Sequence, residues 1–174
     1  RTVGVVGAGQ MGNGIAHVAA VAGFDVQMTD ISQAALDKAR STIEKNLGRM
    51  VKKERIEEAA ANAALARIQS DVEMNILSGS DLVIEAATEN VDLKYKIFDG
   101  LSGIAKPGAI LATNTSSISI TSIASKTDRP DLVMGMHFMN PVPVMKLVEL
   151  IRGLQTSDAT FKTVEAAAQQ MGKT

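Results

Sequence analysis

The sequence contains no cysteine, which excludes a disulfide framework, a thiolate zinc site and a cysteine nucleophile. It has no apolar run near the roughly 18 residues of a membrane-spanning helix, and no recognisable leader, so we expect a cytoplasmic protein. Lys and Arg (18) nearly balance Asp and Glu (19), so charge gives no reason to expect a nucleic-acid or membrane partner. We also predict no metal site.

What is present is the composition of an ordinary α/β protein. The 174 residues are 45% hydrophobic and 3% aromatic, enough for one domain with a full apolar core. Periodicity predicts strands at 2–6, 24–29, 66–69, 81–86, 109–114, 132–137 and 146–151, and helices at 11–22, 91–104, 119–125 and 158–171. The first strand, helix and strand occupy about thirty residues, which predicts a βαβ unit in a mostly parallel, doubly wound sheet.

Residues 33–66 are helical in pattern but too long for one short crossover. An apolar stripe at helical spacing is accompanied by a basic set on the other side. The stripe consists of Leu36, Ile43, Leu47 and Met50, and the basic set consists of Lys38, Lys45, Arg49 and Lys52. We therefore predict a helical-hairpin insertion at about 33–66, projecting from the sheet with one basic face.

A glycine-rich turn joins the first strand to the first helix. It reads Gly7, Ala8, Gly9, Gln10, Met11, Gly12, which matches the pattern G-x-G-x-x-G. Such glycines allow a tight turn, close approach of a pyrophosphate to the backbone, and close packing of helix on strand. Asp30 ends the next strand, 23 residues after Gly7. A carboxylate at this place can accept hydrogen bonds from the ribose hydroxyls and would repel a 2′-phosphate. The alternative interpretation is a structural turn with a surface Asp. The strand before the turn, the helix after it and the place of Asp30 favour instead a Rossmann-type domain that binds NAD rather than NADP.

The two histidines have different settings. His17 lies among apolar residues of the first helix and is interpreted as structural or solvent-facing, with no functional role. His137 ends a predicted strand, at the sheet edge where ligands bind, and a neutral imidazole suits removal of an alcohol proton. Glu149 on the following strand could fix the tautomer of His137, although a purely structural His–Glu pair is an equally good interpretation of the spacing.

The segment Asn114, Thr115, Ser116, Ser117 also follows a predicted strand. Its polar groups should reach the same cleft, and we predict that Asn114 and Ser116 contact the cofactor. A Ser/Thr cap for the next helix explains the segment as well, and one residue can do both.

Four segments together resemble the L-3-hydroxyacyl-CoA dehydrogenase family, particularly its bacterial 3-hydroxybutyryl-CoA members. They are GAGQMGNG at 7–14, DLVIEAATEN at 81–90, NTSSIS at 114–119 and GMHFMNPVPVMKLVELI at 135–151. The resemblance implies that His137 is the catalytic base and Glu149 its orienting partner. It also implies that Ser116 and Asn140 line the place where nicotinamide meets the substrate oxygen, and that Glu89 and Lys94 join the turn and Asp30 in contacting NAD. Without it, Glu89 and Lys94 would be interpreted as a solvated helix start.

The resemblance further implies a short-chain acyl-CoA substrate, 3-hydroxybutyryl-CoA, with CoA against Ser116, Asn46 and Lys53. Met139 departs from the family, which usually has Phe there. Members of the family continue into a C-terminal helical domain that supplies dimer contacts, so we expect this chain to be the N-terminal part of a homodimeric enzyme. Two alternatives stay open: an isolated dinucleotide-binding module with little or no turnover, or a related hydroxy-acid dehydrogenase or crystallin.

Overall fold

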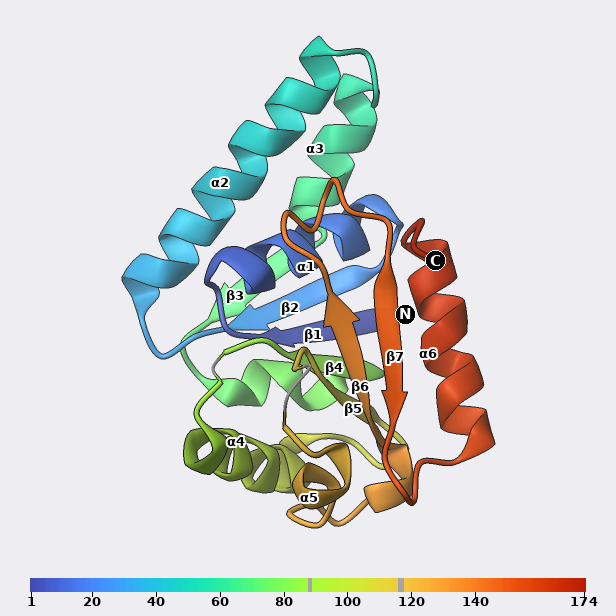
Figure 1. Ribbon diagram of the computed structural model, residues 1–174. Helices are drawn as coiled ribbons and strands as arrows, with labels where there is room; N and C mark the ends of the chain where they lie inside the picture. Colours follow the sequence, from blue (N-terminus) through green and yellow to red (C-terminus); the bar gives the residue numbers. More distant parts are fainter. Residues whose placement is uncertain (88, 116–117) are drawn as a thin grey trace.

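The sheet has seven strands in the order β3-β2-β1-β4-β5-β6-β7 (Figure 1). The computed structural model describes residues 1–87, 89–115 and 118–174. The strands are β1 (Thr2–Val6), β2 (Asp25–Thr29), β3 (Ile68–Asp71), β4 (Leu82–Glu85), β5 (Ile110–Thr113), β6 (Val133–Phe138) and β7 (Val148–Arg152). The first six are parallel and β7 is antiparallel to β6. The predicted doubly wound, mostly parallel sheet is confirmed.

Helices cover both faces of this sheet. They are α1 (Gln10–Val21), α2 (Gln33–Lys52), α3 (Glu58–Ala66), α4 (Val91–Ile104), α5 (Ile120–Ala124) and α6 (Asp158–Gln170), with 3-10 turns η1 (Met74–Gly79) and η2 (Pro130–Leu132). Within the described ranges, no helix is both long and apolar enough to cross a bilayer.

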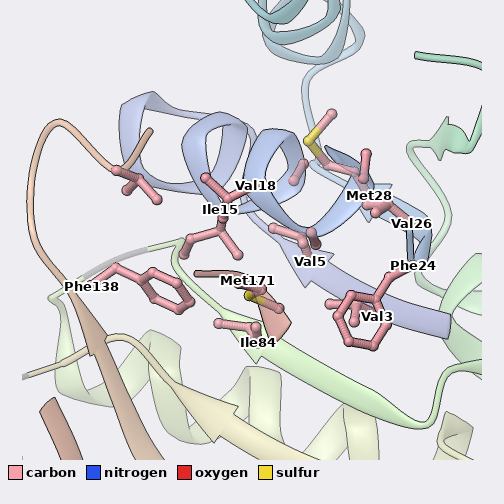
Figure 2. Close-up of a cluster of buried hydrophobic side chains, with 14 of the residues drawn as sticks. Val3, Val5, Ile15, Val18, Phe24, Val26, Met28, Ile84, Phe138 and Met171 are labelled. Atoms are coloured by element: carbon pink, nitrogen blue, oxygen red, sulfur yellow. The ribbon is translucent and has the colours of Figure 1, made fainter. Parts of the chain in front are cut away.

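Two apolar clusters hold the layers together. On one face, Ile15 and Val18 of α1 pack with Val5 and Ile84 of the sheet, next to Phe138 (Figure 2). On the other face, side chains of β4 and β5 pack against η1, α4 and α5. The two central strands β4 and β5 are buried along their whole length, as expected for parallel strands covered on both sides. Their carboxyl ends are thereby fixed as a rigid edge for a site.

The hairpin predicted at 33–66 consists of α2 and α3, which project from the sheet side by side in Figure 1. Ser32 caps α2 by accepting a hydrogen bond from the Ala35 amide. Leu36, Ile43 and Leu47 are buried, whereas the predicted basic side chains are exposed.

Several strand boundaries differ from the predicted ones by one or two residues. The third strand begins at Ile68 rather than residue 66, because α3 continues to Ala66 and the Arg67 amide still bonds to its last turn. The seventh begins at Val148 rather than residue 146, because Lys146 belongs to the loop that precedes it.

His17 is buried at 2% exposure, so of the two settings left open the solvent-facing one is wrong. Its Nδ1 has no hydrogen-bond partner among the described residues. Burial, and secondly the nearby Lys173 charge, lowers the pKa of His17 from 6.5 to about 4. The imidazole is therefore a neutral part of the core.

This burial predicts a loss of stability in acid. In the unfolded state His17 takes up a proton below about pH 6.5, whereas in the folded state it does so only below about pH 4. Protonation therefore stabilises the unfolded state relative to the folded state as the pH falls between these values. We expect the free energy of unfolding to fall by about 2 kcal/mol from pH 7.5 to pH 5 because of His17 alone. Urea titrations of the wild type and His17→Leu measure it: the variant should lose less stability over this interval, and parallel pH curves would contradict the assignment.

Candidate active site

The glycine-rich turn has the geometry of a phosphate-binding turn. Gly7 has a φ of 101°, and its amide donates to the Thr29 carbonyl at 2.8 Å. A Cβ on Gly12 would lie 1.8 Å from the Gly7 carbonyl oxygen, so α1 can approach β1 only with glycine there. A Cβ on Gly9 would meet nothing within 4 Å. The turn is therefore tight where backbone meets backbone and open at Gly9, where the amides at the start of α1 face an incoming anion.

Asp30 is fixed against this turn. One carboxylate oxygen accepts the Ala8 amide and the other accepts the Ser32 amide, both at 2.9 Å. The carboxylate is half-buried, and each oxygen keeps a second lone pair for a further donor. A ribose hydroxyl fits this arrangement, whereas a 2′-phosphate would meet a negative charge held in place by two amides.

An apolar pocket of about 230 Å³ adjoins Asp30. Its walls come from the ends of β1 and β2, η1 and α4. The lining residues are Val6, Gly7, Thr29, Asp30, Ile31, Val72, Met74, Ala87, Leu93 and Ile97. Ile31 is 98% exposed and Leu93 47%, so apolar surface is presented to solvent beside the Asp30 carboxylate. A flat aromatic base such as adenine is the chemistry that fits between such side chains.

His137 and Glu149 face each other across the antiparallel pair β6–β7. They are register partners, and the His137 Nδ1 lies 2.9 Å from the Glu149 Oε1. His137 is 23% exposed and Glu149 52%. When Nδ1–H donates to the carboxylate, Nε2 carries the lone pair that can accept a proton. The predicted pairing is therefore present, at the carboxyl end of β6.

Asn114 connects the ends of β5 and β6. Its Oδ1 accepts the Phe138 amide at 2.7 Å, one residue beyond His137. This contact gives Asn114 a positioning role that its place in the sequence did not indicate, while a direct contact with the cofactor stays a prediction. Asn140 is exposed just beyond β6, and the expectation for Ser116 lies outside the described residues.

Lys94 is not the solvated residue that the sequence alone suggested. It is 1% exposed, and its ammonium bonds to the buried Glu85 carboxylate and to the Thr113 hydroxyl. Glu85 also accepts the Ala87 amide at 2.8 Å. A Cβ on Gly7 would lie 2.7 Å from the Ala87 Cα, so the chain after β4 passes close to the glycine turn. Glu85 and Thr113 were not predicted, because each is a single polar residue at the end of an apolar strand. Contact of Lys94 with NAD stays a prediction.

Three other contacts were expected, at Glu89, Asn46 and Lys53. Glu89 is exposed and accepts the Thr115 hydroxyl at 3.1 Å. Asn46 is half-buried on α2, and Lys53 is exposed directly after that helix. The hairpin thus presents both residues expected to meet CoA.

The chain matches the family model "3-hydroxyacyl-CoA dehydrogenase, NAD binding domain" over residues 2–174. It is 53% identical over 173 residues to 3-hydroxybutyryl-CoA dehydrogenase of Bradyrhizobium diazoefficiens, covering 99% of this chain and 59% of that protein. The crystal structure of (S)-3-hydroxybutyryl-CoA dehydrogenase from Ralstonia eutropha superposes with a TM-score of 0.97 at 57% identity, covering 99% of this chain and 61% of that one. The probable 3-hydroxybutyryl-CoA dehydrogenase of Bacillus subtilis is 47% identical, with 100% and 61% covered.

The fold, the glycine turn and the fixed Asp30 define a dinucleotide-binding domain of the dehydrogenase class. More particularly, the chain belongs to the 3-hydroxyacyl-CoA dehydrogenase family, as its NAD-binding domain. It spans about 60% of the length of the relatives named above.

Proposed function

We propose that this chain forms the cofactor-binding part of an enzyme that reversibly oxidises (S)-3-hydroxyacyl-CoA to 3-ketoacyl-CoA, with short-chain 3-hydroxybutyryl-CoA as substrate. The observation that supports this most is the His137–Glu149 pair at 2.9 Å, on the same carboxyl edge of the sheet as the glycine turn. The choice of substrate is supported by the relatives, which are 3-hydroxybutyryl-CoA dehydrogenases. A cytoplasmic location and a homodimer are part of the same proposal.

The residues of the chain divide the chemistry among them. NAD, when bound, accepts a hydride from the substrate carbon. His137 takes the hydroxyl proton on Nε2, and the Glu149 carboxylate stabilises the imidazolium that results. Ser116 and Asn140 hydrogen-bond the oxygen as it becomes a carbonyl. Asn114 keeps the end of β6 in place through the Phe138 amide.

Binding of CoA is proposed on the hairpin, at Asn46 and Lys53, and at Ser116. The exposed lysines of α2 support the proposal because CoA carries phosphates. Most of these lysines are equally well explained as solvent-exposed side chains without a ligand.

The experiment that tests the function compares turnover with binding. NADH oxidation in the presence of acetoacetyl-CoA is followed at the same time as NADH binding by fluorescence. Turnover with the CoA thioester supports the proposal. Binding without turnover supports instead the second candidate, a dinucleotide-binding module. This candidate is kept because the chain covers only 59% of the length of the Bradyrhizobium relative.

Asp30→Asn should change the preference between the two dinucleotides. The variant loses the negative charge and one of the two side-chain oxygens that accept backbone amides. We therefore expect NADH affinity to fall about tenfold or more, while NADPH affinity falls less or rises. Asp25→Asn, at the exposed start of the same strand, is the matched control. An unchanged ratio of NADH to NADPH affinity in Asp30→Asn would show that this carboxylate does not contact the ribose.

A further inference from the structure

The loop between β6 and β7, residues 139–147, carries Asn140 close behind His137. Two amides of the loop, those of Val144 and Met145, bond to the Pro141 carbonyl. Val142 is buried against α1, where a Cβ on Gly14 would lie 2.7 Å from the Val142 Cβ. The loop therefore rests on the helix that begins at the phosphate-binding turn.

Lys173 reaches this loop from the far end of the chain. Its ammonium donates to the Val142 and Met145 carbonyls, each at 2.6 Å, and the residue is 6% exposed. The backbone follows the same path, because the Thr174 amide bonds to the Lys146 carbonyl and the Val148 amide bonds to the Thr174 carbonyl. In Figure 1 the loop lies beside α1 and the C-terminus, in agreement with these contacts.

The environment of this ammonium is unusual for a buried charge. Buried lysines are rare unless they are paired, and in the part of the chain that the structure describes no carboxylate forms an ion pair with Lys173. Across from it stands the neutral His17, and burial lowers the pKa of Lys173 itself. Its two short hydrogen bonds go instead to backbone carbonyls of one loop. These two hydrogen bonds offset part of the cost of burying the charge, and they tie the ammonium to the path of that loop.

We propose that Lys173 is a positioning residue of the active site: its ammonium holds the β6–β7 loop in the shape that presents Asn140 beside His137. The proposal rests on the proposed function for the role of Asn140. The bonds to Val142 and Met145 bracket the middle of the loop, and Val142 is at the same time seated on Gly14. Without the ammonium, both carbonyls lose a donor, and the middle of the loop keeps only the packing of Val142 on Gly14 and the backbone bond from Thr174 to Lys146 as contacts with the rest of the fold.

Three variants test this inference: Lys173→Met, which keeps the apolar stem, Lys173→Arg, which keeps a charged donor, and Lys162→Met as control. Lys162 lies exposed on α6, and within the described residues it forms no hydrogen bond or ion pair with the loop or with His17. The first readout is tryptic cleavage after Lys146 in the native protein, with cleavage after the exposed Lys53 of the hairpin as internal reference. The second is the split between kcat and KM for acetoacetyl-CoA reduction.

We expect Lys173→Met to speed cleavage after Lys146 about tenfold without changing cleavage after Lys53, and to lower kcat about tenfold while KM for NADH stays within about twofold. Lys173→Arg should reverse part of both effects, and Lys162→Met should match the wild type. Unchanged cleavage after Lys146, or faster cleavage at both sites together, overturns the inference, as does an opened loop with unchanged kcat.

The two proposals fail in different ways. A wild type that binds NADH but reduces no acetoacetyl-CoA contradicts the proposed function, and the cleavage rates still decide whether Lys173 holds the loop. In that case the NMR signal of the Asn140 side-chain amide replaces kcat as the local readout: it should shift in Lys173→Met and not in Lys162→Met, and an unshifted signal overturns the inference.

Discussion

Gly12→Ala should abolish detectable NADH binding and lower the free energy of unfolding by about 3 kcal/mol. The added methyl would lie 1.8 Å from the Gly7 carbonyl oxygen and 2.7 Å from the Gly7 carbonyl carbon. Both atoms belong to the backbone of the turn, so no side-chain rotation relieves the overlap and α1 must move away from β1. The amides at the start of α1 then lose their arrangement around the phosphate. Urea unfolding and NADH fluorescence measure the two effects.

Gly9→Ala is the matched control, because the same methyl at Gly9 meets nothing within 4 Å. Its backbone, with φ of −70° and ψ of −164°, is open to any residue. Stability should stay within about 0.5 kcal/mol of the wild type, whereas NADH affinity should fall because the methyl occupies the space proposed for the pyrophosphate. If Gly9→Ala binds NADH as the wild type does, the diphosphate does not lie there.

His137→Gln should lower kcat by about 10²- to 10⁴-fold while leaving NADH affinity nearly unchanged. Glutamine keeps a polar group opposite Glu149 but has no atom that accepts a proton near neutral pH. The cofactor contacts proposed at the glycine turn and Asp30 do not involve this side chain. Stopped-flow NADH oxidation and fluorescence titration separate the two quantities.

Glu149→Gln serves as the comparison for His137→Gln, because it keeps a hydrogen-bond acceptor for Nδ1 and removes only the charge. It should lower kcat less than His137→Gln does, since the base is retained and only support for the imidazolium is weakened. Full turnover in His137→Gln would assign proton transfer to another group.

The sequence allowed the sheet and the turn to be predicted because both depend on short-range patterns. Strand–helix alternation gave the seven strands, and fixed spacing gave Gly7, Gly12 and Asp30 their places. His137 and Glu149 were predictable as a pair because a reversal between two strands places residues on facing positions, and the β6–β7 register makes them partners.

Contacts that depend on loop shape were not predictable. The burial of Lys94 against Glu85 requires α4 to fold back over the ends of β4 and β5. The hydrogen bond from the Phe138 amide to Asn114 requires β5 and β6 to end side by side. The hydrogen bond from Lys173 to the Val142 carbonyl joins residues 31 positions apart in the sequence. A lone Lys or Asn carries no periodic signal, so such residues are found only when the chain is seen folded.

The central claim is that a dinucleotide lies with its phosphates at Gly9 and its adenosine ribose on Asp30, and isothermal titration calorimetry of the folded chain tests it most directly. We predict saturable heat at one NADH per chain, with NADPH binding at least about tenfold more weakly. A well-folded sample that takes up no NADH, or that binds NADPH as tightly or more tightly, would contradict the claim.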